Sequence, residues 1–123
     1  MWFCAHAIFY FKLLNSEQKS FLIHENVYLV FASDTCAATT VAKEIAKEYE
    51  DTGEEGNLEL NEEKAAFLFA GIRKVISVET HPGSDRANEL SGLEVTYSVY
   101  EVDTLEEVLK LTRGEMVDVL YRE

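Results

Sequence analysis

Proline, cysteine and positive charge are scarce in this sequence, and each scarcity excludes a class of protein. One proline and six glycines are too few for a low-complexity or disordered chain. Two cysteines, Cys4 and Cys36, are too few for a disulfide framework and are typical of a reducing compartment. The opening residues alternate in polarity and carry no basic leader, so we expect a cytoplasmic protein without a signal peptide or a membrane span.

The shortage of positive charge is large. The chain has 11 Lys and Arg residues against 23 Asp and Glu residues, which gives a net charge of −12. Such a chain repels phosphate groups, so we expect no nucleic-acid partner and no anionic membrane surface as a partner. The simplest interpretation of the charge is solubility. The alternative is an acidic protein that occupies a basic protein partner, as a mimic of nucleic acid would.

Apolar residues are plentiful. They make up 47% of the 123 residues, which is enough to form the core of one domain spanning residues 1–123. Residues 2–13 and 21–32 show the period-two alternation of strands and form an expected hairpin. Further strands are expected at 57–61, 65–78, 93–102 and 116–121, and a loop that contains Pro82 and Gly83 is expected at 80–92.

Two helices are expected. The first begins at a capping residue, Ser33 or Asp34, carries an apolar stripe at helical spacing and ends near 51–53. The second begins at the capping-box pattern Thr104 to Glu107 and stops at Gly114. The sequence therefore predicts an α+β domain with a mainly antiparallel sheet of about 5 strands and with one main helix and one short helix packed on one face.

Four segments resemble one known family. They are Trp2-Phe3-Cys4-Ala5-His6, His24-Glu25-Asn26-Val27-Tyr28-Leu29, Phe69-Ala70-Gly71-Ile72-Arg73-Lys74 and Glu94-Val95-Thr96-Tyr97-Ser98. In this order they resemble the bacterial family catalogued as domain of unknown function 4288, over roughly residues 2–103. His24 stands where the family pattern usually has tryptophan. The resemblance implies a bacterial origin and a common fold unit, and it implies no activity, because the family has no established one.

Glu25 and Arg73 are the most informative polar residues. Each interrupts the apolar face of its strand, which runs through alternate residues of 21–31 in one case and of 67–75 in the other. A buried carboxylate needs a partner, and the fork of an Arg side chain matches it. We expect a buried ion pair that holds the strands in register. The alternatives are an anion-binding or acid–base site, and a bulge at Gly71 that turns Arg73 outward.

Histidine and cysteine suggest a metal site that we do not expect to exist. Cys4, His6 and His24 would converge if the first two strands paired suitably, and these residue types bind zinc. No paired ligand spacing supports the site, and Cys36 falls on the main helix, which should pack elsewhere. We therefore predict that the protein binds no metal and no other cofactor, and that the histidines form ordinary hydrogen bonds.

Aromatic residues outside the expected core suggest an interface. The second sheet face would carry Trp2, Ile8, Tyr10, Tyr28 and Val30, which predicts a homodimer. No catalytic motif is recognisable, so the function we expect is a non-catalytic, acidic binding domain, with a basic protein as an alternative partner. The competing hypothesis is a small enzyme or ligand-binding protein. Its candidate polar cluster is Glu25, Arg73, His6, Asn26 and Tyr97.

Overall fold

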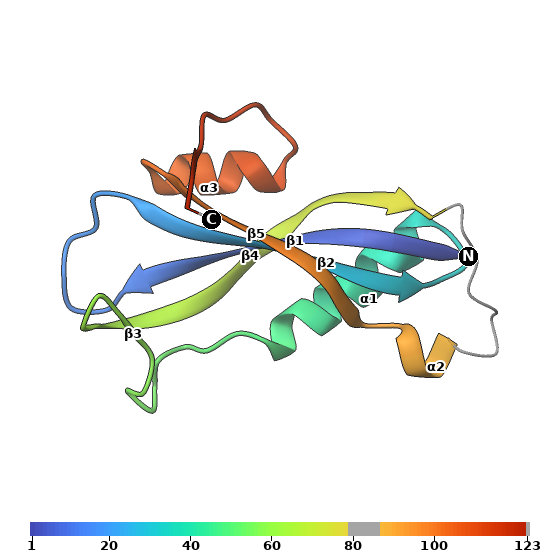
Figure 1. Ribbon diagram of the computed structural model, residues 1–123, viewed down its shortest axis with the longest axis horizontal. Coiled ribbons are helices and arrows are strands. Elements are labelled where there is room, and N and C mark those ends of the chain that lie inside the picture. The colour runs from blue at the N-terminus through green and yellow to red at the C-terminus, as the bar shows by residue number, and fades with distance from the viewer. Residues whose placement is uncertain (79–86, 123) are drawn as a thin grey trace.

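The structure, a computed structural model, describes residues 1–78 and 87–122. The strands are β1 (Trp2–Leu13), β2 (Phe21–Phe31), β3 (Glu59–Leu60), β4 (Glu63–Ser77), β5 (Leu93–Val102) and β6 (Leu120–Tyr121), and the helices are α1 (Thr35–Glu48), α2 (Ala87–Leu90) and α3 (Leu105–Thr112). The strands form one sheet in the order β3-β4-β1-β2-β5-β6, and each neighbouring pair is antiparallel. The predicted antiparallel α+β fold is confirmed (Figure 1).

The hairpin of β1 and β2 forms the centre of the sheet. Its register pairs Trp2 with Phe31 and continues without interruption to Tyr10 opposite Ile23. Because successive side chains of a strand point to opposite faces, this register assigns every residue of the hairpin to one of two faces. We call them the α1 face and the α3 face, after the helix that covers each.

The α1 face holds the larger core cluster. The side chain of Asp34 caps α1 by accepting from the amide of Ala37, as the sequence predicts. Three alanines one turn apart, Ala38, Ala42 and Ala46, are the buried residues of the helix. They pack against Phe3, Ala5, Ala7 and Phe9 of β1 and against Tyr28 and Val30 of β2. Small residues at this spacing let the helix lie close to the aromatic rings of the sheet.

The α3 face holds the second cluster. The predicted capping box is present, with reciprocal hydrogen bonds between Thr104 and Glu107. Farther along α3, Val108 and Leu111 pack on Ile8 of β1, Ile23 of β2 and the two β5 residues Tyr100 and Val102.

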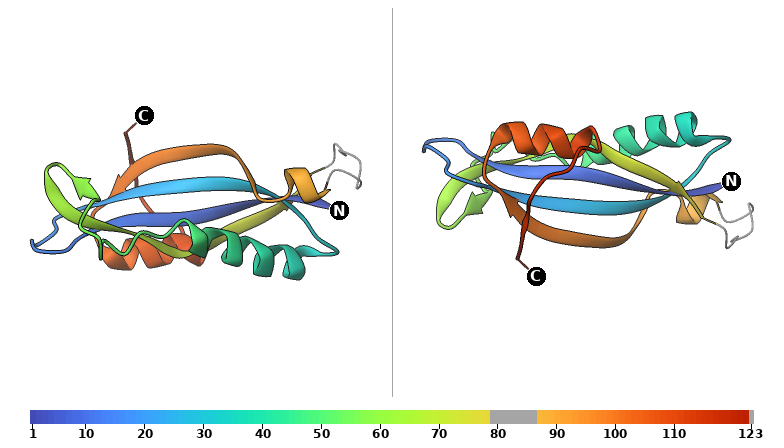
Figure 2. Two further views of the ribbon diagram at one scale, coloured as in Figure 1. Left: turned by 90° about the horizontal axis from the view of Figure 1, so that it is seen from below. Right: turned by 90° about the horizontal axis from the view of Figure 1, so that it is seen from above.

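The two main helices lie on opposite faces of the sheet, so the prediction that both pack on one face is wrong. Ile8 lies between Ala7 and Phe9 in β1, so its side chain points away from α1 and toward α3. Figure 2 shows α1 in front of the sheet in one view and α3 in front of it in the opposite view. The physical reason is that β1 and β2 are apolar on both faces, which one layer of helix cannot cover.

β4 departs from simple alternation. Its pairing with β1 shifts register twice, between His6 and Ala7 and between Ile8 and Phe9. Phe67, Phe69 and Val75 consequently pack toward α1, whereas Arg73 reaches the α3 face. The expectation that these residues share a face with Arg73 is wrong, because each bulge adds one residue and reverses the alternation.

Gly71 lies between the two shifts, at a point where α3 approaches the strand closely. A β-carbon at this position would lie 2.9 Å from the β-carbon of Thr112 in α3. The helix therefore rests almost directly on the strand.

Two later expectations differ in detail. The strand predicted at 116–121 is reduced to Leu120–Tyr121, and residues 113–119, here called the strap, run without regular structure from α3 to β6. The loop predicted at 80–92 contains the single-turn helix α2, and its residues 80–86 lie outside the described part of the chain. In the described residues, no helix is long and apolar enough to cross a membrane.

Candidate functional site

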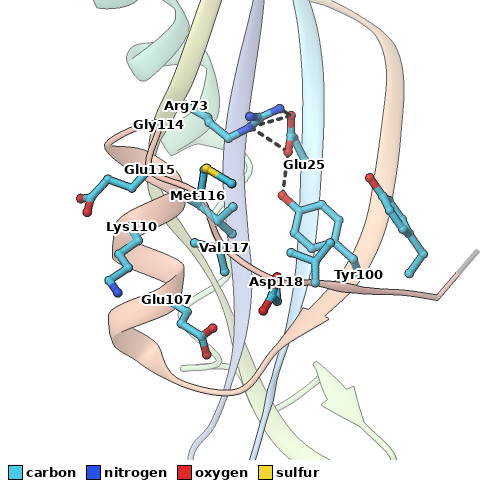
Figure 3. A pocket seen from close by; sticks show the side chains of 13 residues that line it. Glu25, Arg73, Tyr100, Glu107, Lys110, Gly114, Glu115, Met116, Val117 and Asp118 are labelled. Atoms are coloured by element: carbon cyan, nitrogen blue, oxygen red, sulfur yellow. Dashed lines mark hydrogen bonds and ion pairs between the residues drawn. The ribbon is translucent and has the colours of Figure 1, made fainter.

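One carboxylate, that of Glu25, organises the polar side chains of the α3 face. It lies in β2 and is only 6% exposed. Arg73 donates to it from Nε at 3.1 Å to both oxygens and from Nη2 at 2.9 Å to Oε2. His6 Nδ1 lies 2.7 Å from Oε2, and the hydroxyl of Tyr100 donates to Oε1 at 2.6 Å. Figure 3 shows the Arg73 and Tyr100 side chains converging on this carboxylate.

Each member of this Glu25 cluster comes from a different strand. His6 is on β1, Glu25 on β2, Arg73 on β4 and Tyr100 on β5, and these four strands are neighbours in the sheet. Arg73 is the extra residue of the bulge opposite His6 and Ala7, between Ile72 and Lys74, which both pair with β1. The bulge turns the guanidinium toward Glu25, so the predicted ion pair forms. The cluster ties four adjacent strands together through one anion.

The electrostatics of the cluster fix its charges. Burial by itself raises the pKa of Glu25, but hydrogen bonds from His6, Arg73 and Tyr100 and the charge of Arg73 outweigh it and lower the pKa to about 2. Burial and the hydrogen bond to Glu25 raise the pKa of Tyr100 well above its usual range. Because the ionised carboxylate can only accept, the proton of a neutral His6 ring resides on Nδ1.

The candidate polar cluster of the sequence is therefore only partly assembled. Glu25, Arg73 and His6 come together, whereas Asn26 and Tyr97 lie on the α1 face. The amide of Asn26 donates to the hydroxyl of Tyr28 at 3.3 Å. The ring of Tyr97 is exposed and stacks on His24, with ring centroids 6.2 Å apart. Register separates them, because Asn26 follows Glu25 directly in β2 and pairs with Tyr97 in β5.

Tyr100 is a member of the cluster that the sequence did not predict. It is 4% exposed, and its pairing with Ile23 brings its hydroxyl within reach of Glu25. The one available signal was that Tyr100 shares its strand face with the inward-facing Val102. That signal does not reveal a partner on the neighbouring strand that is 75 residues away in the sequence.

Cys4, His6 and His24 do not converge. His6 pairs with Val27 and therefore points to the α3 face, whereas His24 pairs with Phe9 and points to the α1 face. There the His24 ring packs edge-on against Phe67, and burial lowers the pKa of His24. In residues 1–78 and 87–122, no three His, Cys, Asp or Glu side chains are grouped so that they could hold a metal ion.

A pocket of about 520 Å³ lies beside the Glu25 cluster, between the sheet, α3 and the strap (Figure 3). The sheet contributes Glu25, Arg73 and Tyr100, α3 contributes Glu107, Lys110 and Leu111, and the remaining lining residues are Gly114, Glu115, Met116, Val117, Asp118, Val119 and Tyr121. The volume is in the range of small-molecule sites and of sockets that receive a partner's side chain.

The charges at this pocket are only partly compensated. Arg73 is paired with Glu25, Glu107 accepts hydrogen bonds from the cap of α3, and Glu115 is paired with Arg113. Lys110 and Asp118 form no ion pair within the described part of the chain. Glu107 also keeps its charge, because its donors in the cap are neutral groups. Among the described residues the pocket therefore has two carboxylates without a cationic partner, Glu107 and Asp118, and one cation without an acidic partner, Lys110.

Comparisons of the chain with protein-family models, with curated proteins and with solved structures give no match.

Proposed function

We propose that this chain is a non-catalytic binding domain that captures a basic protein partner. The observation that carries the proposal is the state of Glu25, which is nearly inaccessible and already accepts hydrogen bonds from three side chains. A carboxylate in this state holds strands in place. It has no lone pair to spare for a substrate and, with a pKa of about 2, no proton to give.

Proton-transfer chemistry is poorly supported at this cluster. A general acid or base works best when its pKa lies near the operating pH. The pKa of Glu25 is far below that range, and those of Tyr100 and Arg73 are raised even further above their already high usual values. Three of the four members of the cluster are thus held in one charge state. This supports a structural role for the cluster and favours binding over catalysis.

The charge of the chain supports the choice of partner. With 23 acidic against 11 basic residues, the molecule attracts cationic surfaces and repels anionic ones. Complementary charge of this kind raises the rate of association and makes binding sensitive to salt. A basic protein therefore fits better than nucleic acid or an anionic membrane.

The second candidate function is binding of a small ligand, and the pocket is the observation that favours it. Arg73 is paired on one side only and keeps a partly exposed side chain, 30% accessible, at the pocket wall. A ligand with an acceptor group could bind to the remaining Nη1. In that case the ligand would be found with the protein rather than with a second chain.

One experiment separates the two functions. The tagged chain is used to capture proteins from bacterial lysate at low and at high salt, and the protein purified natively is examined by native mass spectrometry. Captured proteins that are basic and that are released by salt support the proposal. A stoichiometric small molecule that remains with the chain, together with no salt-sensitive protein, would replace it with the ligand-binding function.

The homodimer predicted from the sequence needs a different surface. Trp2, Ile8, Tyr28 and Val30 are each at most 2% exposed within the single chain, and Tyr10 is partly buried. We propose the outer edge of β5 instead. Among the described residues, this edge is hydrogen-bonded near β6, at Val99, Tyr100 and Glu101, and the side chains of Leu93, Val95 and Tyr97 are exposed farther along it. An open strand edge with apolar side chains is suited to pairing with another strand.

A further inference from the structure

The C-terminal part of the chain exposes an unusual set of apolar side chains. Those of α3, the strap and β6 that are exposed are Leu105, Leu109, Met116, Leu120 and Tyr121. Met116 is 98% exposed and Tyr121 66% exposed, although both line the pocket. Large apolar side chains that line a pocket and are left in water, as Met116 and Tyr121 are, are typical of a site that another molecule covers.

Part of the inner surface of the pocket is apolar and can pack against an aromatic side chain. Its apolar walls are Leu111 of α3, Val117 and Val119 of the strap, and the ring of Tyr100, against which the ring of Tyr121 packs edge-on with centroids 5.8 Å apart. Nε and Nη2 of Arg73 are occupied by Glu25, whereas Nη1 makes no hydrogen bond within the described residues. The guanidinium therefore remains available for stacking with an aromatic ring.

The rim of the pocket is acidic. The pocket is lined by three carboxylates besides Glu25, namely Glu107, Glu115 and Asp118, and by one lysine, Lys110. The charge of Arg73 does not offset them, because it is already paired with Glu25. Arg113 lies nearby and is paired with Glu115 and with Glu106. Asp118 is exposed and forms no ion pair with any described residue, so it is the carboxylate most available to an incoming cation.

We propose that this α3–strap surface docks a segment of the basic partner, which inserts an aromatic side chain into the pocket and places Lys or Arg residues against the rim. The proposal rests on the proposed function and adds its location and its chemistry. The aromatic anchor would meet Tyr100, Tyr121 and Arg73, and the flanking cations would meet Asp118 and Glu107. A buried aromatic anchor within a ring of polar contacts is the usual arrangement of an interface hot spot.

Charge also argues against a second copy of the chain as the occupant. A twofold contact would bring the same surface of two molecules together, and with it Glu107, Glu115 and Asp118 from both. Like charges that face each other in an interface are destabilising. A partner of opposite charge avoids this cost.

A synthetic peptide tests the surface. The probe has one central Trp between lysines in a Gly and Ser background, and the controls replace Trp with Ala or the lysines with Glu. The peptide is titrated into the uniformly ¹⁵N-labelled full chain. We expect shifts of the backbone amides at Arg73, Tyr100 and residues 107–121, and about 30-fold weaker binding of the Ala peptide, as loss of a hot-spot anchor implies.

A pair of charge reversals supplies the control within the protein. Asp118→Lys and Glu55→Lys change the net charge equally at two exposed positions, of which only Asp118 lines the pocket. We expect Asp118→Lys to weaken binding of the Trp peptide by about fivefold more than Glu55→Lys does. Equal effects of the two variants, or shifts elsewhere in the chain, would overturn the docking surface and leave the proposed function standing. Failure of both lysine peptides to bind would contradict both proposals.

Discussion

Replacing Arg73 with alanine should destabilise the fold far more than a surface substitution does. Arg73 makes three of the five hydrogen-bond contacts to the Glu25 carboxylate, and Glu25 is 6% exposed. The variant would leave a buried anion with only His6 and Tyr100 as donors. Removal of one partner of a buried ion pair typically costs about 3–5 kcal/mol. Because Arg73 is itself 30% accessible and two donors remain, we expect the lower end, about 3 kcal/mol.

Urea denaturation measures this loss as a decrease in the free energy of unfolding. Lys47→Ala is the control, because Lys47 is an exposed residue of α1. Its effect should stay within about 0.5 kcal/mol, as is usual for surface positions. If Arg73→Ala cost no more than Lys47→Ala, then Glu25 would not depend on Arg73 and the buried-pair argument would be refuted.

A double-mutant cycle refines this prediction. When Glu25→Gln is combined with Arg73→Ala, no uncompensated anion remains in the core. The double variant should therefore be more stable than the sum of the two single losses implies, by at least about 1 kcal/mol. Strict additivity would show that the two side chains stabilise the fold independently of each other.

Four further outcomes follow from the structure. The pKa of Glu25 is lowered from 4.5 to about 2, so the stability it contributes is present above pH 4.5 and is lost as the pH falls toward 2. When the free energy of unfolding is measured as a function of pH, this loss should be absent in Glu25→Gln. An acid titration of the variant that matches that of the unmodified protein would contradict the assignment. Gly71→Ala should cost about 1–3 kcal/mol in urea melts, because its β-carbon would lie 2.9 Å from Cβ and 3.1 Å from Cγ2 of Thr112 in α3. Thr112→Ala removes the Cγ2 contact and should recover part of the loss if these contacts are the cause. Sedimentation at micromolar concentration should show a dimer that Tyr97→Lys dissociates; a 14.0 kDa species at every concentration would rule out the β5 edge as an interface. Added chelator should leave the melting temperature unchanged, since His6 and His24 lie on opposite faces, and a decrease that depends on His6 would overturn this expectation.

Local signals in the sequence determined where most elements begin and end. The period-two pattern predicts β5 at 93–102, and the structure has it at Leu93–Val102. The capping box of Thr104 and Glu107 and the cap at Asp34 are confirmed, because they depend on residues a few positions apart. Glu25 was recognisable as a buried anion because it interrupts an apolar strand face. Its need for a cation pointed to Arg73, whose residue type alone matches a carboxylate bidentately.

Only the tertiary structure decided which faces these elements share. The alternating pattern of a strand shows that odd and even residues point to opposite faces of the sheet. It does not show which residues of the neighbouring strand point to the same face. Register decides this, and register depends on hydrogen bonds between residues far apart in the sequence. A difference of one residue therefore separates Asn26 and Tyr97 from Glu25 and places His24 away from His6.

The bulges of β4 had the same kind of effect. Arg73 reaches Glu25 because two register shifts reverse the alternation of its strand, and only the residues packed on both sides of β4 reveal them. The position of Tyr100 and the pocket beside it could not be predicted from the sequence, for a related reason. Their positions result from α3 and the strap closing over a sheet face whose members come from four strands. No spacing within any one segment encodes that assembly.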